Sequence, residues 1–292
     1  MNQSTNFRIE RLAAGLYFVA TPIGSARDIT LRALDVLASA DVIASEDTRN
    51  TRKLMDIHGI PLGDRPLIAY HDHNGDRVRP RLLGFMAAGQ SVAYASDAGT
   101  PLVADPGYGL MRGAIDAGHV VTSAPGPSAA LAALTVAGLP NDRFTFAGFA
   151  PQAKGARRTF LESLKDYKST VILFESPKRI KGLLGDLCDT FGQARQIAVC
   201  RELTKKFEEV LRGSVSEIQS QLEDRTLKGE IVVVIDRPAP KVARTEDIDA
   251  ALQDALIEMR VKDAANHVAD QFGLPKRDTY QRALKLKEER QI

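Results

Sequence analysis

Cysteine is scarce in this chain, which has only Cys188 and Cys200 in 292 residues. Both stand among apolar neighbours. Two cysteines supply neither a disulfide framework nor the ligand spacing of a zinc site. This usage fits buried thiols in a reducing compartment, so we expect a cytoplasmic protein.

Strong net charge and long unbroken apolar runs are also lacking. The formal net charge is +2, so a nucleic-acid-binding protein of this composition must concentrate its basic residues locally. The N-terminal segment MNQSTNFRIERLAAG has no apolar core of a signal peptide. The longest uncharged stretch, 120–141, is interrupted by Pro and Gly and is rich in Ala, Ser and Thr. We therefore expect no membrane span and no membrane partner.

Two nucleotide-binding motifs are absent as well. The turn Thr21-Pro-Ile-Gly24 follows an apolar run but is too poor in glycine for a dinucleotide fingerprint, and no Gly-Lys-Ser/Thr phosphate loop is present. Glu46 follows a second apolar run and could hold a ribose, but no glycine-rich turn precedes it. A nicotinamide-dependent dehydrogenase is thereby disfavoured.

The chain does contain short Val- and Ile-rich runs that alternate with helical patterns. This alternation predicts parallel or mixed sheets covered by helices, and the length suits about two such domains. The break between Pro125 and Pro140 suggests two α/β halves with a cleft where they meet. A first helix follows Asp28, which could cap it. The predicted strands are Leu16–Ala20, Val42–Ala44, Leu67–Tyr70, Val92–Ala95, Val120–Ser123, Phe144–Phe149, Thr170–Phe174, Ile197–Cys200 and Glu230–Asp236.

Beyond a linker-like segment at 237–241, the pattern becomes entirely helical. We expect helices at Glu246–Met259, Lys262–Phe272 and Asp278–Glu289. Residues 263–284 have the pattern of a helix-turn-helix, which binds either nucleic acid or, as a helical cap, the main body or a dimer partner. The predicted domains are therefore 1–124 and 125–238, both α/β, and a small helical domain at 239–292.

Two turn-rich segments at predicted strand ends have the composition of ligand loops. Residues 95–107 read ASDAGTPLVADPG, in which glycines permit close backbone approach and prolines stiffen the loop. In the segment 124–130, Ser128 can cap a helix whose free N–H groups suit a carboxylate. Simple connection and simple capping are the alternatives. Together these loops suit a nucleoside joined to an amino acid, such as S-adenosylmethionine, although spacing alone does not name it.

Two further clusters have more than one interpretation. His71 and His73 would share a face of an extended segment as a metal pair, but no third ligand cluster accompanies them. We therefore expect no metal, and instead hydrogen bonding at the cleft or at a subunit contact. Residues 151–181 carry eight Lys or Arg against three acids. With Arg49, Arg52 and Lys53 they form either a phosphate-contacting rim or a solvated helix face.

Read in order, the motifs resemble one family. The chain is similar to ribosomal RNA small subunit methyltransferase I, within the tetrapyrrole-methylase-like class of S-adenosylmethionine methyltransferases. The resemblance spans about residues 15–236, and the helical tail resembles the C-terminal domain of the same enzymes. It rests on TPIG (21–24), EDTR (46–49), HDHN (71–74), SDAGTPLVADPG (96–107), APGPSAA (124–130), ESPKRI (175–180), RELTKKFEE (201–209) and KGEIVVVI (228–235).

The resemblance implies a pair of α/β domains, a homodimer and a methyl donor in the interdomain cleft. It further implies 2′-O-methylation of a cytidine, cytidine 1402, in 16S ribosomal RNA, with the small ribosomal subunit as the partner. Carried over by position, the residues that contact S-adenosylmethionine are Pro22, Ala98, Gly99, Thr100, Val103, Ser128, Ala129, Phe174 and Leu203.

The sequence departs from related patterns at three places. Gly99-Thr100-Pro101 replaces the Gly-Asp-Pro of tetrapyrrole methylases, which separates this chain from the porphyrin branch. Lys178 and Phe207 stand where the family commonly has histidines. Neither of those histidines can therefore be an obligatory base in this protein.

Methyl transfer to a ribose hydroxyl benefits from alignment and from a nearby proton acceptor. The candidates for this acceptor are Glu175, Glu46, Asp47 and His71, and each acid could instead be the ion-pair partner of a nearby cation. Arg49, Lys178, Arg179 and Lys205 are the candidates for binding RNA phosphates. A small-molecule methylase of the same fold and a non-enzymatic RNA-binding factor are the competing functions.

Overall fold

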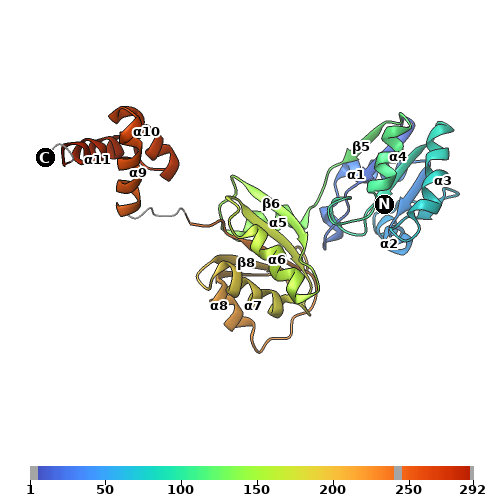
Figure 1. The fold of residues 1–292 in the computed structure, drawn as a ribbon. Helices are drawn as coiled ribbons and strands as arrows, with labels where there is room; N and C mark the ends of the chain where they lie inside the picture. The colour runs from blue at the N-terminus through green and yellow to red at the C-terminus, as the bar shows by residue number, and fades with distance from the viewer. Residues whose placement is uncertain (1–5, 240–244, 290–292) are drawn as a thin grey trace. The chain divides into compact units, whose positions relative to one another are not determined.

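The computed structural model describes residues 6–239 and 245–289. Its contacts separate two units, Met1–Arg237 and Pro238–Ile292 (Figure 1). The linker expected at 237–241 lies partly outside the described residues. The two units agree with a main body followed by a separate helical segment.

The first sheet is fully parallel, in the order β3-β2-β4-β1-β5. Its central strands are mostly apolar because helices cover both faces, and Ser45 and Ser91 are the polar residues at their ends. Helices α1 and α2 pack on one face and α3 and α4 on the other. The elements are β1 (Gly15–Val19), α1 (Leu31–Ser39), β2 (Val42–Ser45), α2 (Thr48–Ile57), β3 (Leu67–Ala69), α3 (Gly75–Ala87), β4 (Ser91–Ala95), α4 (Tyr108–Asp116) and β5 (Val121–Ala124).

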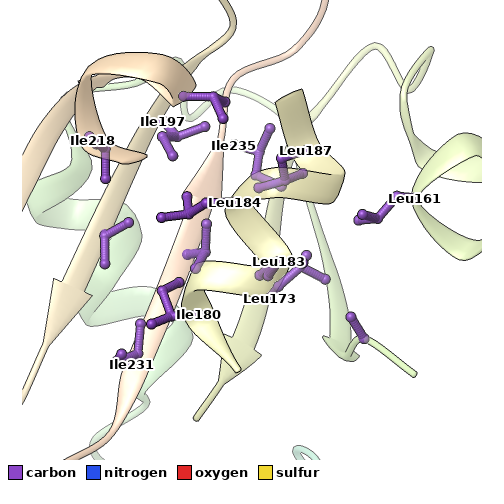
Figure 2. Packing of buried hydrophobic residues seen from close by; sticks show 14 of the residues in the cluster. Leu161, Leu173, Ile180, Leu183, Leu184, Leu187, Ile197, Ile218, Ile231 and Ile235 are labelled. Atoms are coloured by element: carbon purple, nitrogen blue, oxygen red, sulfur yellow. The ribbon is translucent and has the colours of Figure 1, made fainter. Parts of the chain in front are cut away.

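The second sheet is mixed, in the order β6-β7-β10-β8-β9. Only β6 and β7 pair in parallel. Helix α5 packs on one face and α6, α7 and α8 on the other, where a Leu- and Ile-rich core forms (Figure 2). The elements are α5 (Ala129–Ala137), β6 (Phe144–Phe149), α6 (Lys154–Leu164), β7 (Thr170–Glu175), α7 (Ile180–Phe191), β8 (Gln196–Arg201), β9 (Glu209–Ser214), α8 (Val215–Leu222) and β10 (Ile231–Ile235).

Two local features differ from the sequence expectation. Strand β9 was not predicted, because this edge strand pairs with β8 alone and carries Glu209 and Arg212 within a short run. The first helix begins at Leu31, where the Thr30 hydroxyl accepts a hydrogen bond from the backbone N–H of Ala33. Asp28 ends a short 3-10 turn (η1, Ala26–Asp28) and does not cap the helix.

The C-terminal unit contains α9 (Thr245–Glu258), α10 (Val261–Phe272) and α11 (Lys276–Glu289). Their shared core is built on small and aliphatic side chains such as Leu252, Ala265 and Val268. Gly273 ends α10 with φ +66°, as the turn requires. Across residues 6–239 and 245–289, none of the helices combines the length and apolar character needed to cross a membrane.

The fold class predicted from the sequence is confirmed, with two helix-covered sheets and a small all-helical segment. The sheets occupy residues 15–124 and 144–235. The finer division at 124 and 238 stays a prediction.

Candidate active site

A cleft of about 430 Å³ lies where strand ends of the two sheets meet, within the range of small-molecule sites. The loops after β1, β2 and β4 contribute from the first sheet, and the ends of β6, β7 and β8 from the second. The lining residues are Ile23, Glu46, Asp97, Ala98, Gly99, Thr100, Val103, Ala104, Asp105, Ser128, Ala129, Phe149, Phe174, Glu175, Ser176, Pro177, Cys200, Leu203, Gly229, Glu230, Ile231 and Val232.

The loop after β4 is held rigid by its own hydrogen bonds. Gly99 and Thr21 exchange both backbone hydrogen bonds, each 2.9 Å. The Ser96 hydroxyl donates to the Gly99 carbonyl at 2.6 Å, and the Thr100 hydroxyl donates to the Pro127 carbonyl at 2.9 Å. Gly99 has φ +81°, which favours glycine. The loop is therefore a preformed wall, although the N–H and C=O of Gly99 are already occupied.

Backbone strain is concentrated beside the cleft. Leu102, Ala104, Glu202 and Thr204 are the non-glycine residues with positive φ in the part of the chain that the structure describes. They fall in two loops, one from each α/β half. Such conformations persist only where surrounding contacts impose them, and they gather at functional sites.

The loop that contains Glu202 and Thr204 is hydrogen-bonded to the first half of the chain. The Thr204 hydroxyl accepts a hydrogen bond from the Ser25 backbone N–H at 3.1 Å. A Cβ on Gly24 would lie 2.5 Å from Cγ of Lys205. The glycine of the TPIG turn is therefore required by close packing against the second half.

Ser128 occupies the residue before α5, but its side chain makes no capping hydrogen bond. The expectation that it caps this helix is wrong. Its hydroxyl lines the cleft, as does Ala129 at the helix start. The first-turn N–H groups of an uncapped helix carry partial positive charge and suit a carboxylate.

The cleft is lined by carboxylates and, among the described residues, by no Lys, Arg or His. Such a lining favours a cation over a phosphate. Its negative charge is reduced by two ion pairs, of Glu175 with Arg179 and of Glu230 with Lys205. The five carboxylates belong to Glu46, Asp97, Asp105, Glu175 and Glu230.

Two of these carboxyl groups have raised pKa values. Burial, followed by the charges of Glu46 and Asp97, raises the pKa of Asp105 to about 7. Burial, followed by Asp97 and Asp72, raises the pKa of Glu46. Glu46 therefore contributes to the raised pKa of Asp105, whereas the pKa of Glu46 itself is raised by burial and by other neighbouring carboxylates.

Asp97 and Asp105 differ in their bonding. Asp97 accepts a hydrogen bond from the Asp47 backbone N–H at 2.9 Å, which ties the loop to the start of α2. Asp105 accepts no hydrogen bond from any described residue. Asp97 therefore organises the loop, and Asp105 has no hydrogen bond that would give it the same role.

Glu175, at the end of β7, has a fully buried side chain. One carboxylate oxygen, Oε1, accepts a hydrogen bond from the Ser176 N–H at 2.7 Å and pairs with Arg179 Nε at 3.2 Å. The other, Oε2, is buried with no hydrogen-bond partner among the described residues. A buried acceptor left open in this way is costly unless a ligand satisfies it.

The other two candidate acceptors lie outside the cleft lining. Asp47 caps α2 through the Arg49 N–H and pairs with the Arg49 side chain, which lowers its pKa to about 2. Nδ1 of His71 is buried and has no hydrogen-bond partner in the part of the chain that the structure describes, and the His71 ring lies 6.0 Å from that of His73. No cluster of three metal-ligating side chains occurs within the described ranges.

Of the nine predicted donor contacts, only Pro22 is not part of the lining, although the next residue, Ile23, is. The residues that do line the cleft are Ala98, Gly99, Thr100, Val103, Ser128, Ala129, Phe174 and Leu203.

The four predicted phosphate-binding cations all lie outside the lining and differ in availability. Lys178 is exposed and makes no ion pair with a described residue. The Arg49 side chain is 88% exposed although it pairs with Asp47. Arg179 donates to the carbonyls of residues 150 and 151. Lys205 bonds Glu202 at 2.9 Å and Glu230 at 2.6 Å.

The basic segment 151–181 is not a uniform rim. Arg157 is buried and bonds the buried Asp186 at 2.6 Å. Lys154 and Lys168 are exposed and, within the described ranges, have no ion-pair partner. Arg157 therefore stabilises the fold, whereas Lys154 and Lys168 are available to bind an anion.

The sequence reasoning missed Phe149 and Glu230, both in the lining. Phe149 is the last residue of a predicted strand, and this position was the available signal, whereas Glu230 is the first residue of its predicted strand and carried no such signal. Neither residue type marks a site by itself.

Comparisons with known proteins agree with this architecture. Residues 15–219 match the family described as Tetrapyrrole (Corrin/Porphyrin) Methylases, and 242–287 match the RsmI C-terminal HTH domain. Two solved structures share the fold. Diphthine synthase matches with a TM-score of 0.59 and 15% identity, over 76% of this chain and 89% of that one. Cobalt precorrin-4 methyltransferase matches with a TM-score of 0.56 and 18% identity, over 76% of this chain and 94% of that one. Fold and cleft thus define a methyltransferase of the tetrapyrrole methylase class.

The curated relatives narrow this class. The proteins named ribosomal RNA small subunit methyltransferase I from Mesorhizobium japonicum and Halalkalibacterium halodurans are 48% and 41% identical to this chain. The matches cover 95% and 91% of this chain and 94% and 93% of those proteins. The chain belongs to the ribosomal RNA small subunit methyltransferase I family.

Proposed function

We propose that this protein transfers a methyl group from S-adenosylmethionine to a ribose 2′-oxygen of small-subunit ribosomal RNA, at cytidine 1402. The cleft's carboxylate lining is the observation that carries the donor assignment. A sulfonium is cationic and suits this lining, whereas a nucleotide diphosphate does not. The substrate assignment rests on the family and its named relatives.

The residues present fit the donor. The rigid wall at Ala98, Gly99 and Thr100 and the apolar side chains of Val103 and Leu203 suit the nucleoside, and the uncapped start of α5 suits the amino-acid carboxylate. When bound, the donor supplies an electrophilic methyl group. Pro22 would then act only through the backbone of its turn.

Glu175 is the proposed proton acceptor, because it lines the cleft and its Oε2 is a buried acceptor without a partner among the described residues. It would accept a hydrogen bond from the ribose hydroxyl and hold that group in place. Glu46, with its raised pKa, is the second candidate. Asp47 and His71 are less suited, since neither lines the cleft.

The RNA phosphates remain outside the cleft in this proposal. Lys178 and Arg49 are exposed enough to meet them, together with the unpaired Lys154 and Lys168. Arg179 and Lys205 instead hold the chain's own backbone and acids in place. The helical unit adds RNA contacts through its helix-turn-helix pattern. We further propose a cytoplasmic homodimer, as the resemblance implies.

A labelling assay tests the function. Purified protein is given labelled S-adenosylmethionine with small ribosomal subunits, free 16S RNA or a uroporphyrinogen. Label should enter ribosomal RNA and remain in a dinucleotide after alkaline hydrolysis, because a methylated 2′-oxygen cannot attack the adjacent phosphate. Transfer to the uroporphyrinogen alone would favour a small-molecule methylase, and no transfer would favour a non-enzymatic RNA-binding factor.

A further inference from the structure

Phe149 is an exposed aromatic residue that the donor assignment leaves unused. It is the last residue of β6, lines the cleft, and remains 55% exposed. A ring that is both part of a binding cleft and accessible from solvent can contact an incoming ligand.

A bulge in β6 sets the direction of this ring. Phe146 pairs with Ile172 and Phe149 with Phe174, so three steps along β6 match two along β7. The extra residue places Phe149 on the same sheet face as Phe146, which simple alternation would not do. Gly148, inside the bulge, has φ +68°. The local sequence is therefore built to turn an aromatic ring toward the cleft.

Neighbouring groups hold Phe149 in position. Its ring meets Phe174 edge-to-face at 5.6 Å, and Phe174 meets Phe146 at 4.8 Å. The next two residues are fixed through their carbonyls by Arg179, whose own position is set by Glu175. The Phe149 ring thus packs against Phe174 and keeps an accessible surface, so that it has little conformational entropy left to lose on binding.

The chemistry of the cleft identifies the ligand of this ring. The carboxylate lining disfavours RNA phosphates, and a volume of about 430 Å³ cannot admit a duplex. An unpaired nucleotide can present its ribose and base alone, and unpaired bases are commonly recognised by stacking on aromatic side chains. The donor suits the preformed wall, whereas RNA arrives from solvent.

We propose that Phe149 stacks on the base of the target nucleotide and thereby positions its 2′-oxygen, an inference that rests on the proposed function. Phe149 is a positioning residue in this scheme, acting through the base on the reacting ribose. The aromatic face matters more than the phenyl identity, because every base offers a π face.

The test combines variants with a modified substrate. Phe149→Ala should lower kcat/KM for ribosomal RNA about 5- to 100-fold, the range of one lost base–aromatic stack. S-adenosylmethionine affinity by calorimetry should remain within about twofold, the effect expected of a residue without donor contact. Phe149→Tyr should restore most of the activity. Phe144→Ala is the matched control, since Phe144 opens the same strand and is 45% exposed but does not line the cleft.

An RNA that lacks only the target base, with its ribose and 2′-hydroxyl intact, separates stacking from a structural effect. On this RNA, wild type and Phe149→Ala should have equal rates. The wild-type sequence contains no tryptophan, so Phe149→Trp supplies a single fluorophore whose emission should be quenched by intact RNA and not by the base-less RNA.

Three results would overturn the assignment: an equal penalty on both RNAs, a large loss of donor affinity, or Trp quenching by the donor instead of RNA. Failure of the wild-type protein to methylate any ribosomal RNA is a different outcome and refutes the proposed function itself.

Discussion

Replacing Asp105 by asparagine should stabilise the protein at alkaline pH and have little effect near pH 4. The pKa of Asp105 is raised from 3.8 to about 7, first by burial and then by Glu46 and Asp97. Between these values the folded protein retains a proton that the unfolded chain has released, so this group's contribution to stability falls as pH rises through that window. Asparagine mimics the protonated form at every pH.

The size of the effect follows from the two pKa values. Their difference sets a ceiling of roughly 4 kcal/mol in the free energy of unfolding above pH 7. Asp105 is only half-buried, and solvent screening reduces this figure to about 1–2 kcal/mol. The variant should therefore gain about 1–2 kcal/mol over wild type at pH 8, and the gain should vanish as the pH approaches 4.

Urea denaturation of both proteins from pH 4 to pH 8, without donor, measures this difference. Asp64→Asn is the control, since Asp64 is exposed and bonds no described residue. Its curve should stay within about 0.5 kcal/mol of wild type throughout. A pH-independent difference, or an Asp105→Asn protein less stable than wild type at pH 8, would refute the reasoning.

Three further predictions follow from the geometry. Gly99→Val should abolish donor binding in calorimetry, because φ is +81° and a Cβ there lies 3.3 Å from Ile23; unchanged affinity would disprove our placement of the donor wall. Arg157→Ala should lower the free energy of unfolding by about 3–5 kcal/mol in urea, since Asp186 is left buried and unpaired. A loss below about 1 kcal/mol, as for surface pairs, would contradict that account. Deleting residues 240–292 should slow RNA methylation in the labelling assay and leave donor affinity nearly intact, and a normal rate would exclude an RNA role for the helical unit.

Strands with a strong apolar signal could be predicted from sequence almost to the residue. The strands β4 and β10 are buried on both faces, so every position is apolar except Ser91 at the start of β4. The edge strand β9 was not predicted because Glu209 and Arg212 interrupt its apolar pattern. The start of α1 was misplaced because Asp28 and Thr30 are both good caps, and only the backbone path decides between them.

The loops of the site were predictable from their Gly and Pro content, but their electrostatics were not. Glu46, Asp105 and Glu230 are far apart in the sequence, and the fold alone makes one negative surface of them. Charge sign suggested phosphate contacts for Arg179 and Lys205, yet both have internal acceptors supplied by distant segments. Long-range pairing of this kind leaves no local pattern in a single sequence.

The negative cleft also bears on turnover under the proposed function. The donor's sulfur is positively charged, whereas the thioether that remains after transfer is neutral at that atom. The lining therefore attracts the fresh donor more strongly than the spent one. Charge alone favours the exchange of spent for fresh donor and limits inhibition by the product, even though the two molecules differ by a single methyl group.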